Sequence, residues 1–140
     1  MNAQDILAAI KALKLLNGSY IVVGGSSLAL RGIRDTHDLD IIVTSELFST
    51  LAKQLPLDPE YQRKWNRQRI KKDLIEIYPD LLLENKNTFL DIQKFIAEAE
   101  FIDNIPVQPL EHLMMCKLDT GREKDLQDVV LIQQYLKTRN

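Results

Sequence analysis

The chain has 140 residues, 45% of them hydrophobic, and a formal net charge of −2 at pH 7. This length and composition fit one globular domain over residues 1–140, and the acidic balance argues against bulk non-specific binding to nucleic acid. No apolar run approaches the roughly 20 residues of a membrane span, and the first residues lack the layout of a secretory signal, so we expect a cytoplasmic protein without a membrane partner.

The first third of the chain alternates predicted helices and strands. Apolar residues at helical spacing predict a first helix, which Asn2 caps and Gly18 ends. The elements expected next are a buried strand over residues 20–23, a short helix over residues 28–31 capped by Ser26 and Ser27, a strand over residues 38–43, and a helix that Ser45 caps and Pro56 stops.

The rest of the chain is less regular in its middle and helical at its end. The predicted elements are a loop over residues 56–60, an exposed strand over 65–72, a buried strand over 74–78, a helix over about 89–99, a short edge strand over 105–107, and helices over 110–120 and 123–137. In the last helix, Leu126, Val129, Val130 and Leu136 are the expected core residues. This mixed order predicts an α/β or α+β fold with a helical C-terminus.

Gly24-Gly25-Ser26-Ser27 lies where the first strand meets the short helix. Glycines let a phosphate approach the backbone, and a helix N-terminus offers unpaired N–H groups and a positive dipole end. Serine hydroxyls can donate to the same phosphate oxygens. Taken alone, these four residues favour a plain strand-to-helix turn, because neither the dinucleotide fingerprint nor the Gly-Lys-Ser/Thr phosphate loop is present.

Asp38 and Asp40 point to the same side of a strand because strand side chains alternate, while Leu39 points into the core. Two neighbouring carboxylates in an otherwise apolar strand repel each other and lose hydration, and a magnesium ion relieves both costs. The alternative is a polar strand start in which each aspartate pairs with Arg31 or Arg34. The order of glycine turn, helix and aspartate strand favours the metal site.

These segments resemble a known family. Gly24-Gly25-Ser26 followed by Asp38-Leu39-Asp40 resembles the motif of DNA polymerase β-type nucleotidyltransferases. Residues 34–40 are similar to the Arg-x-Thr-x-Asp-x-Asp stretch of the small bacterial and archaeal members, and residues 117–128 are similar to a helical motif near the end of those proteins, including the AbiEii-type toxins.

The resemblance implies a short mixed sheet flanked by helices, with the active site at one sheet edge. It also implies that an acceptor hydroxyl on RNA or protein attacks the α-phosphorus of a nucleoside triphosphate, with two Mg²⁺ ions between carboxylates and phosphates. A toxin–antitoxin or defence pair with an antitoxin-type protein partner is one implied setting. The implied nucleotide-binding residues are Gly24, Gly25, Ser26, Ser27, Arg34, Lys117 and Arg122.

A third carboxylate completes the site in this family, and we assign it to Glu76, so that Asp38, Asp40 and Glu76 are the expected catalytic residues and metal ligands. Glu76 is a lone charge in an apolar strand, and a buried charge needs a partner. The family's acid is commonly aspartate, which keeps Asp73 and Asp80 as rivals. Pairing of Glu76 with a nearby lysine is an equally good structural explanation.

Two basic regions have both a functional and a structural explanation. Trp65, Arg67, Arg69 and Lys71 share one face of the expected strand, which suits an RNA acceptor or a protected edge strand, and we favour the latter. Lys117 and the nearby bases either contact the triphosphate or pair with Asp125 and Asp128. A catalytically inactive module that binds nucleotide or a protein partner is the alternative function, and a purely structural, partner-binding protein is a third.

Overall fold

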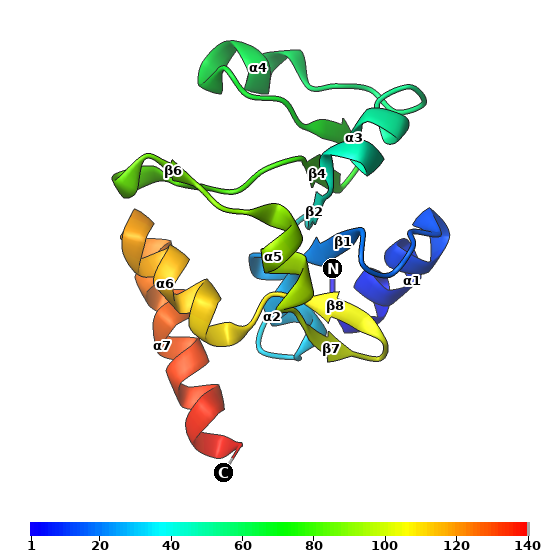
Figure 1. The fold of residues 1–140 in the computed structure, drawn as a ribbon. Helices are drawn as coiled ribbons and strands as arrows, with labels where there is room; N and C mark the ends of the chain where they lie inside the picture. Colours follow the sequence, from blue (N-terminus) through cyan, green and yellow to red (C-terminus); the bar gives the residue numbers. More distant parts are fainter. Residues whose placement is uncertain (140) are drawn as a thin grey trace.

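The computed structural model describes residues 1–139, in which helices surround a mixed six-stranded sheet (Figure 1). The α-helices are α1 Ala3–Leu13, α2 Gly25–Leu30, α3 Ser45–Leu51, α4 Pro59–Trp65, α5 Ile92–Ala97, α6 Leu110–Thr120 and α7 Glu123–Thr138, with a 3₁₀ turn, η1, at Glu84–Lys86. The strands are β1 Tyr20–Val22, β2 Leu39–Val43, β3 Ile70–Lys72, β4 Ile75–Tyr78, β5 Leu82–Leu83, β6 Thr88–Phe89, β7 Glu100–Ile102 and β8 Ile105–Val107. The expected α/β class with a helical C-terminus is confirmed.

The sheet has the strand order β3-β4-β2-β1-β8-β7. β2 lies at its centre, antiparallel to β1 and parallel to β4. The β2–β4 register places Asp40 directly opposite Glu76. β5 and β6 form a separate hairpin.

Residues of β2 alternate between two hydrophobic clusters. Ile41 belongs to a cluster that α1 and α3 cover, whereas Ile42 belongs to a cluster that α5 covers. Asp40 has the same strand parity as Ile42 and therefore lies on its face of the sheet, whereas Asp38, which the sequence places in the strand, lies in the bend just before it. The C-terminal helices α6 and α7 lie side by side and pack on Leu28 of α2 (Figure 1).

The predicted ends of three helices need correction. Asn2 caps α1 as expected, but the helix ends at Lys14, which adopts the left-handed conformation, and Gly18 lies in the following turn. α2 begins at Gly25 rather than at residue 28, and its N-cap is Gly24. α3 is capped by Thr44 and ends near Leu51, before Pro56.

The segment around residues 56–72 differs most from the prediction. The helix α4, which begins at Pro59 after the cap Asp58, replaces the expected loop and the start of the expected exposed strand. Asp58 caps this helix by accepting hydrogen bonds from two backbone N–H groups, and proline suits a first helical position. Only Ile70–Lys72 forms a strand, so Trp65, Arg67, Arg69 and Lys71 do not share one strand face.

The second half of the chain is closer to expectation. The helix predicted over residues 89–99 is shorter, as α5, because residues before it belong to the β5–β6 hairpin. β8 is not an edge strand, since β1 and β7 lie on its two sides. α6 and α7 confirm the two predicted helices, but Leu126 and Val130 are about half exposed, and Val129 and Ile132 supply the buried face of α7.

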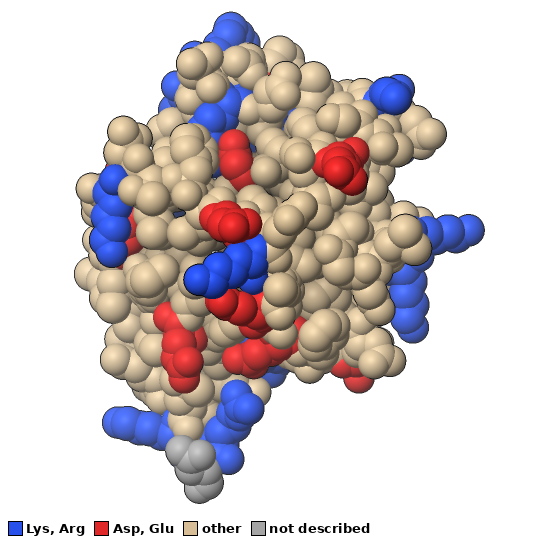
Figure 2. Space-filling model, viewed as in Figure 1, with Lys and Arg blue, Asp and Glu red and all other residues tan. Residues whose placement is uncertain are grey.

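None of the helices in residues 1–139 has the length and apolar character that crossing a membrane requires. On the face drawn in Figure 2, acidic and basic side chains lie intermixed across the middle of the molecule. This face therefore lacks the one-signed field that promotes non-specific binding to a polyanion.

Candidate functional site

Asp40 lies at the centre of the candidate site. Its backbone N–H donates to Ser26 Oγ over 2.8 Å, and its side chain stands beside the Gly24-Gly25 turn. A Cβ atom added to Gly24 would lie 3.6 Å from Asp40 Oδ2. The aspartate strand and the glycine turn therefore converge, as the sequence predicts.

Asp40 carries a charge that the protein only partly compensates. Burial, followed by the nearby carboxylates of Glu76 and Asp38, raises the pKa of Asp40 to about 7. Its Oδ1 atom is buried without a hydrogen-bond partner in the structure. A buried carboxylate among like charges is unfavourable unless a cation or a proton neutralises it.

Glu76 is the third acid beside Asp38 and Asp40, and its 7% exposure makes it nearly inaccessible. Arg69, rather than a lysine, is its ion-pair partner. Burial raises the pKa of Glu76, and the charge of Arg69 opposes that rise. The rival acids lie elsewhere: Asp80 pairs with Arg67 over 2.5 Å, and Asp73 occupies a turn with a positive φ.

The Gly24-Gly25 turn depends on both glycines. Gly24 has φ +61°, in the range that favours glycine. A Cβ atom on Gly25 would lie 2.8 Å from Thr36 Oγ1 and 3.1 Å from an Arg34 guanidinium nitrogen, so Arg34 lies directly against the start of α2.

The two serines differ from the sequence-based expectation. Both are fully buried, and neither lines the cavities described below. Ser26 Oγ donates to the carbonyl of Asp38 over 2.9 Å and accepts from the N–H of Asp40, which joins α2 to β2. Ser27 Oγ donates to the carbonyl of Gly24 over 2.6 Å. In this conformation the hydroxyls hold the turn in place and do not face a ligand.

A cavity of about 520 Å³ opens between the glycine turn and the C-terminal helices, and we call it the charged cavity. Its lining includes Gly24, Gly25, Arg34, Thr36, Asp40, Lys117, Arg122, Lys124, Asp125, Gln127, Asp128 and Leu131. Five of the seven predicted nucleotide-binding residues thus surround one space, with Asp40 at its edge.

Carboxylates already pair with the predicted phosphate-binding cations. Asp128 accepts from Arg34 over 2.7 and 2.8 Å and lies 2.8 Å from Lys117 Nζ, while Asp125 accepts from Arg122 over 2.8 Å. Burial alone would raise the pKa of Asp125, but hydrogen bonds from Arg122 and Thr120 lower it to about 2. The alternative pairing of Asp38 or Asp40 with Arg31 or Arg34 is not found, because Arg31 pairs with Glu100 and Arg34 with Asp128.

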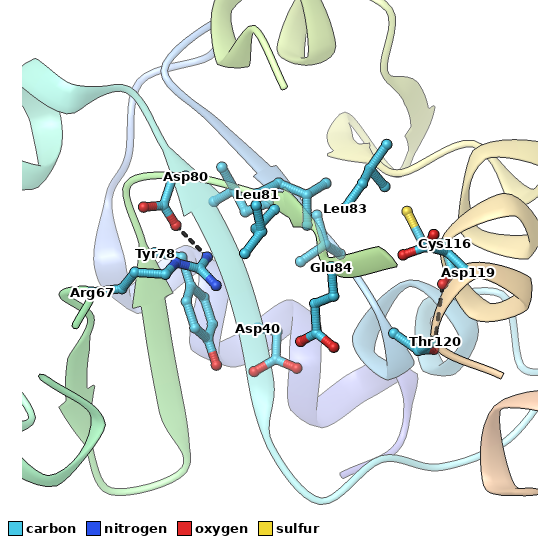
Figure 3. A pocket seen from close by; sticks show the side chains of 13 residues that line it. Asp40, Arg67, Tyr78, Asp80, Leu81, Leu83, Glu84, Cys116, Asp119 and Thr120 are labelled. Carbon is cyan, nitrogen blue, oxygen red and sulfur yellow. Dashed lines mark hydrogen bonds and ion pairs between the residues drawn. The ribbon is translucent and has the colours of Figure 1, made fainter. Parts of the chain in front are cut away.

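A second cavity of about 250 Å³, the apolar cavity, also reaches Asp40 (Figure 3). Val23, Ile42, Tyr78 and residues 81–83 form its apolar wall, and Cys116, Asp119 and Thr120 of α6 form the opposite side. In Figure 3 the Glu84 carboxylate points toward the same space as that of Asp40. Burial raises the pKa of the Cys116 thiol to about 11, so this cysteine is a wall residue and not a thiolate nucleophile.

Two contributors to the site escaped the sequence reasoning. Gln108 Oε1 accepts from the N–H of Gly24 over 3.0 Å, and its amide nitrogen lies 2.9 Å from His112 Nδ1. Gln108 therefore ties the glycine turn to the start of α6. Arg69 was missed because its expected strand placed it on a solvent face, although the Asp58-Pro59 helix start was readable in the sequence.

The three acids differ in how well they suit a magnesium ion. Within residues 1–139, no group of three or more histidine, cysteine, aspartate or glutamate side chains is placed so that it could hold a metal ion. Asp38 lies in the bend before β2 with its charge near Asp40, and Asp40 has an unpartnered buried oxygen, so this pair fits a hard cation. Glu76 differs because Arg69 already neutralises it.

Comparison with known proteins adds no family to this description. No protein-family model, no curated protein and no solved structure matches the chain.

Proposed function

We propose that this protein is a metal-dependent nucleotidyltransferase, which moves a nucleoside monophosphate from a nucleoside triphosphate to a hydroxyl of an RNA or protein acceptor. The observation that carries the proposal is the position of Asp40, which lies beside the glycine turn and lines both cavities. The resemblance of the Gly24–Ser26 and Asp38–Asp40 segments to polymerase β-type enzymes supports it.

The two cavities suit different parts of one nucleotide. The charged cavity brings Arg34, Lys117 and Arg122 next to the glycine turn, which favours the β- and γ-phosphates. The apolar cavity offers Val23, Ile42 and the ring of Tyr78 to a base and presents carboxylates that accept hydrogen bonds from sugar or amino groups. The α-phosphate then lies beside Asp40, where the cavities meet.

In the proposed reaction the acceptor hydroxyl gives its proton to water, its oxygen forms a bond to the α-phosphorus, the bond from that phosphorus to the bridging oxygen breaks, and pyrophosphate leaves. Asp38 and Asp40 would hold Mg²⁺, which when bound supplies charge neutralisation to the α-phosphate and leaving group. Arg34, Lys117 and Arg122 neutralise the departing pyrophosphate after exchanging their present carboxylate partners for phosphate oxygens.

Transfer of label tests this proposal. The purified protein is incubated with Mg²⁺, α-phosphate-labelled ATP, CTP, GTP or UTP, total RNA and lysate protein. We expect label on one acceptor class, including this chain itself if it is its own acceptor, and no label with the Asp38→Asn/Asp40→Asn variant. A wild type that binds triphosphate but transfers no label to any acceptor would contradict catalysis.

A catalytically inactive nucleotide-binding module is the second candidate, and a specific observation favours it. Each predicted phosphate-binding cation is already ion-paired, and so is Glu76. Such a module binds triphosphate in a manner that depends on Asp38 and Asp40 without releasing pyrophosphate. For either function, the resemblance implies an antitoxin-type protein as the partner of this chain.

A further inference from the structure

Arg69 is fixed in the structure by contacts on several sides. Its Nε and Nη2 atoms donate to Asp58 Oδ2 over 2.9 and 2.8 Å, and Nη1 donates to the Tyr78 hydroxyl over 2.9 Å. Its guanidinium carbon lies 4.5 Å from the centre of the Tyr61 ring. Asp58 is itself held because it caps α4. Arg69 is therefore a stationary cation and not a mobile surface side chain.

This stationary cation is directed at the third acid. Nη1 of Arg69 forms an ion pair with Glu76 Oε2, and Glu76 lies opposite Asp40 in the sheet register. Both side chains are mostly buried, and 18% of the Arg69 side chain is exposed. A guanidinium beside a carboxylate offsets its charge and occupies lone pairs of the oxygen it contacts, here Oε2 of Glu76, so both become less available to a metal ion.

We propose that Arg69 takes the place of a second metal ion, so that the carboxylate group binds one divalent cation through Asp38 and Asp40 while Glu76 remains paired with Arg69. This inference rests on the proposed metal site and changes its stoichiometry from two ions to one. The oxygen of Asp40 that remains open to a ligand is Oδ1, which is buried without a hydrogen-bond partner.

Manganese binding measures this stoichiometry without any enzymatic turnover. Mn²⁺ is titrated into the metal-free protein, and bound ions are counted by electron paramagnetic resonance. We expect one ion per chain with the spectrum of an isolated ion. Two ions in a shared site lie about 3.5–4 Å apart and couple magnetically, so a coupled spectrum from the wild type would overturn the proposal.

A charge-balanced set of variants identifies the role of Glu76. Arg69→Met frees Glu76, and we expect a second ion or about tenfold tighter Mn²⁺ binding, comparable to the effects of residues around metal ligands. Glu76→Gln removes the carboxylate between Arg69 and the aspartates, so the positive charge of Arg69, which Asp58 alone then pairs with, repels the metal and affinity falls. Arg69→Met with Glu76→Gln removes both charges and should restore the wild-type affinity and the single ion.

If Arg69→Met does not fold, the double variant still tests whether Glu76 is a metal ligand, because it contains no unpaired Glu76 carboxylate. Loss of Mn²⁺ binding in a folded double variant would show that Glu76 is a ligand and would overturn the proposal. Lys71→Met is the matched control, since Lys71 lies opposite Glu76 on β3 and carries the same charge without pairing with it in an ion pair. Lys71→Met should leave one bound ion per chain. A second ion in this variant would mean that loss of any nearby positive charge, and not loss of the Arg69–Glu76 pair, admits the second ion, and it would contradict the proposal.

The experiments can distinguish failure of the single-ion inference from failure of the proposed function. A single Mn²⁺ ion that Asp40→Asn removes, in a protein that binds no nucleoside triphosphate, would support this inference and contradict nucleotidyl transfer. A protein that binds nucleoside triphosphate only with Mg²⁺ and holds two coupled Mn²⁺ ions would support the proposed function and contradict the single-ion inference. A wild type that binds no Mn²⁺ at all contradicts both.

Discussion

Asp40, the central residue of the proposed metal site, lowers the stability of the metal-free fold. Asp40 is buried near Asp38 and Glu76, and its Oδ1 atom has no hydrogen-bond partner. Burial of an uncompensated carboxylate destabilises the folded state, and such residues concentrate at functional sites. Leu39 and Ile41, which alternate with the aspartates, are fully buried and supply the stability of the same strand.

Asp40→Asn should therefore stabilise the metal-free protein at pH 8. The pKa of Asp40 is raised from 3.8 to about 7, so its ionisation disfavours the folded state increasingly as pH rises from about 4 to 7. We expect the variant to gain roughly 1–4 kcal/mol in free energy of unfolding by urea with a chelator present, since one pKa unit is about 1.4 kcal/mol. The gain should shrink at pH 5, and a variant less stable than the wild type at pH 8 would contradict this reading.

Asp125 has the opposite pH dependence. Its pKa is lowered from 3.8 to about 2, so its stabilising effect is complete above pH 4 and is lost as the pH falls toward 2. Asp125→Asn should lower the free energy of unfolding at pH 6 by about 1–3 kcal/mol and lose less further stability than the wild type between pH 5 and pH 2.5. Parallel pH profiles of the two proteins in urea unfolding would contradict this.

At the scale of elements, the candidate site depends on hydrogen bonds between adjacent helices, strands and turns. Ser26 joins α2 to β2, and Gln108 joins the glycine turn to α6. The β5–β6 hairpin closes the apolar cavity toward α6, where the backbone N–H of Asn85 donates to Asp119 over 3.3 Å. These hydrogen bonds hold in place the elements that line the two cavities, which share Asp40.

A larger side chain in the apolar cavity tests whether this cavity binds the nucleoside part of the nucleotide. Leu82→Trp places a ring at the half-buried β5 position that lines this cavity. We expect ATP affinity to fall by about tenfold, which is about 1.4 kcal/mol, while binding of inorganic tripolyphosphate in the charged cavity is unchanged. Leu74→Trp, at a 52% exposed position, is the control. Equal losses for ATP and tripolyphosphate would remove the nucleoside from this cavity.

The sequence predicts those elements whose pattern is local and strong. The β-branched run after Asp40 and the cap at Asn2 indicate β2 and α1 without any tertiary information. α4 was missed because alternating Trp65, Arg67, Arg69 and Lys71 have the period of a strand, although only residues 70–72 form one. The role of Glu76 was half predicted: its burial follows from its apolar neighbours, whereas its partner Arg69 depends on how the chain folds back between α4 and β4.

At the scale of the molecule, the candidate site joins segments that are far apart in sequence. Arg34 pairs with Asp128 across 94 positions, and Gly24 bonds to Gln108 across 84. The segments that resemble polymerase β-type enzymes near both ends of the chain therefore meet at one place, which no local pattern could predict. Arg34, Lys117 and Arg122 of the charged cavity pair with Asp125 or Asp128, so their contact with a triphosphate requires an exchange of partners within the cavity.

The most direct test of the central claim is the binding of ATP measured calorimetrically with Mg²⁺ and with a chelator, for the wild type and for Asp38→Asn/Asp40→Asn. If the aspartates, the glycine turn and the C-terminal cations form one metal–nucleotide site, the wild type binds ATP only with Mg²⁺, and the folded variant loses that binding. Equal affinity in the two proteins, or binding that ignores Mg²⁺, would contradict the site described here.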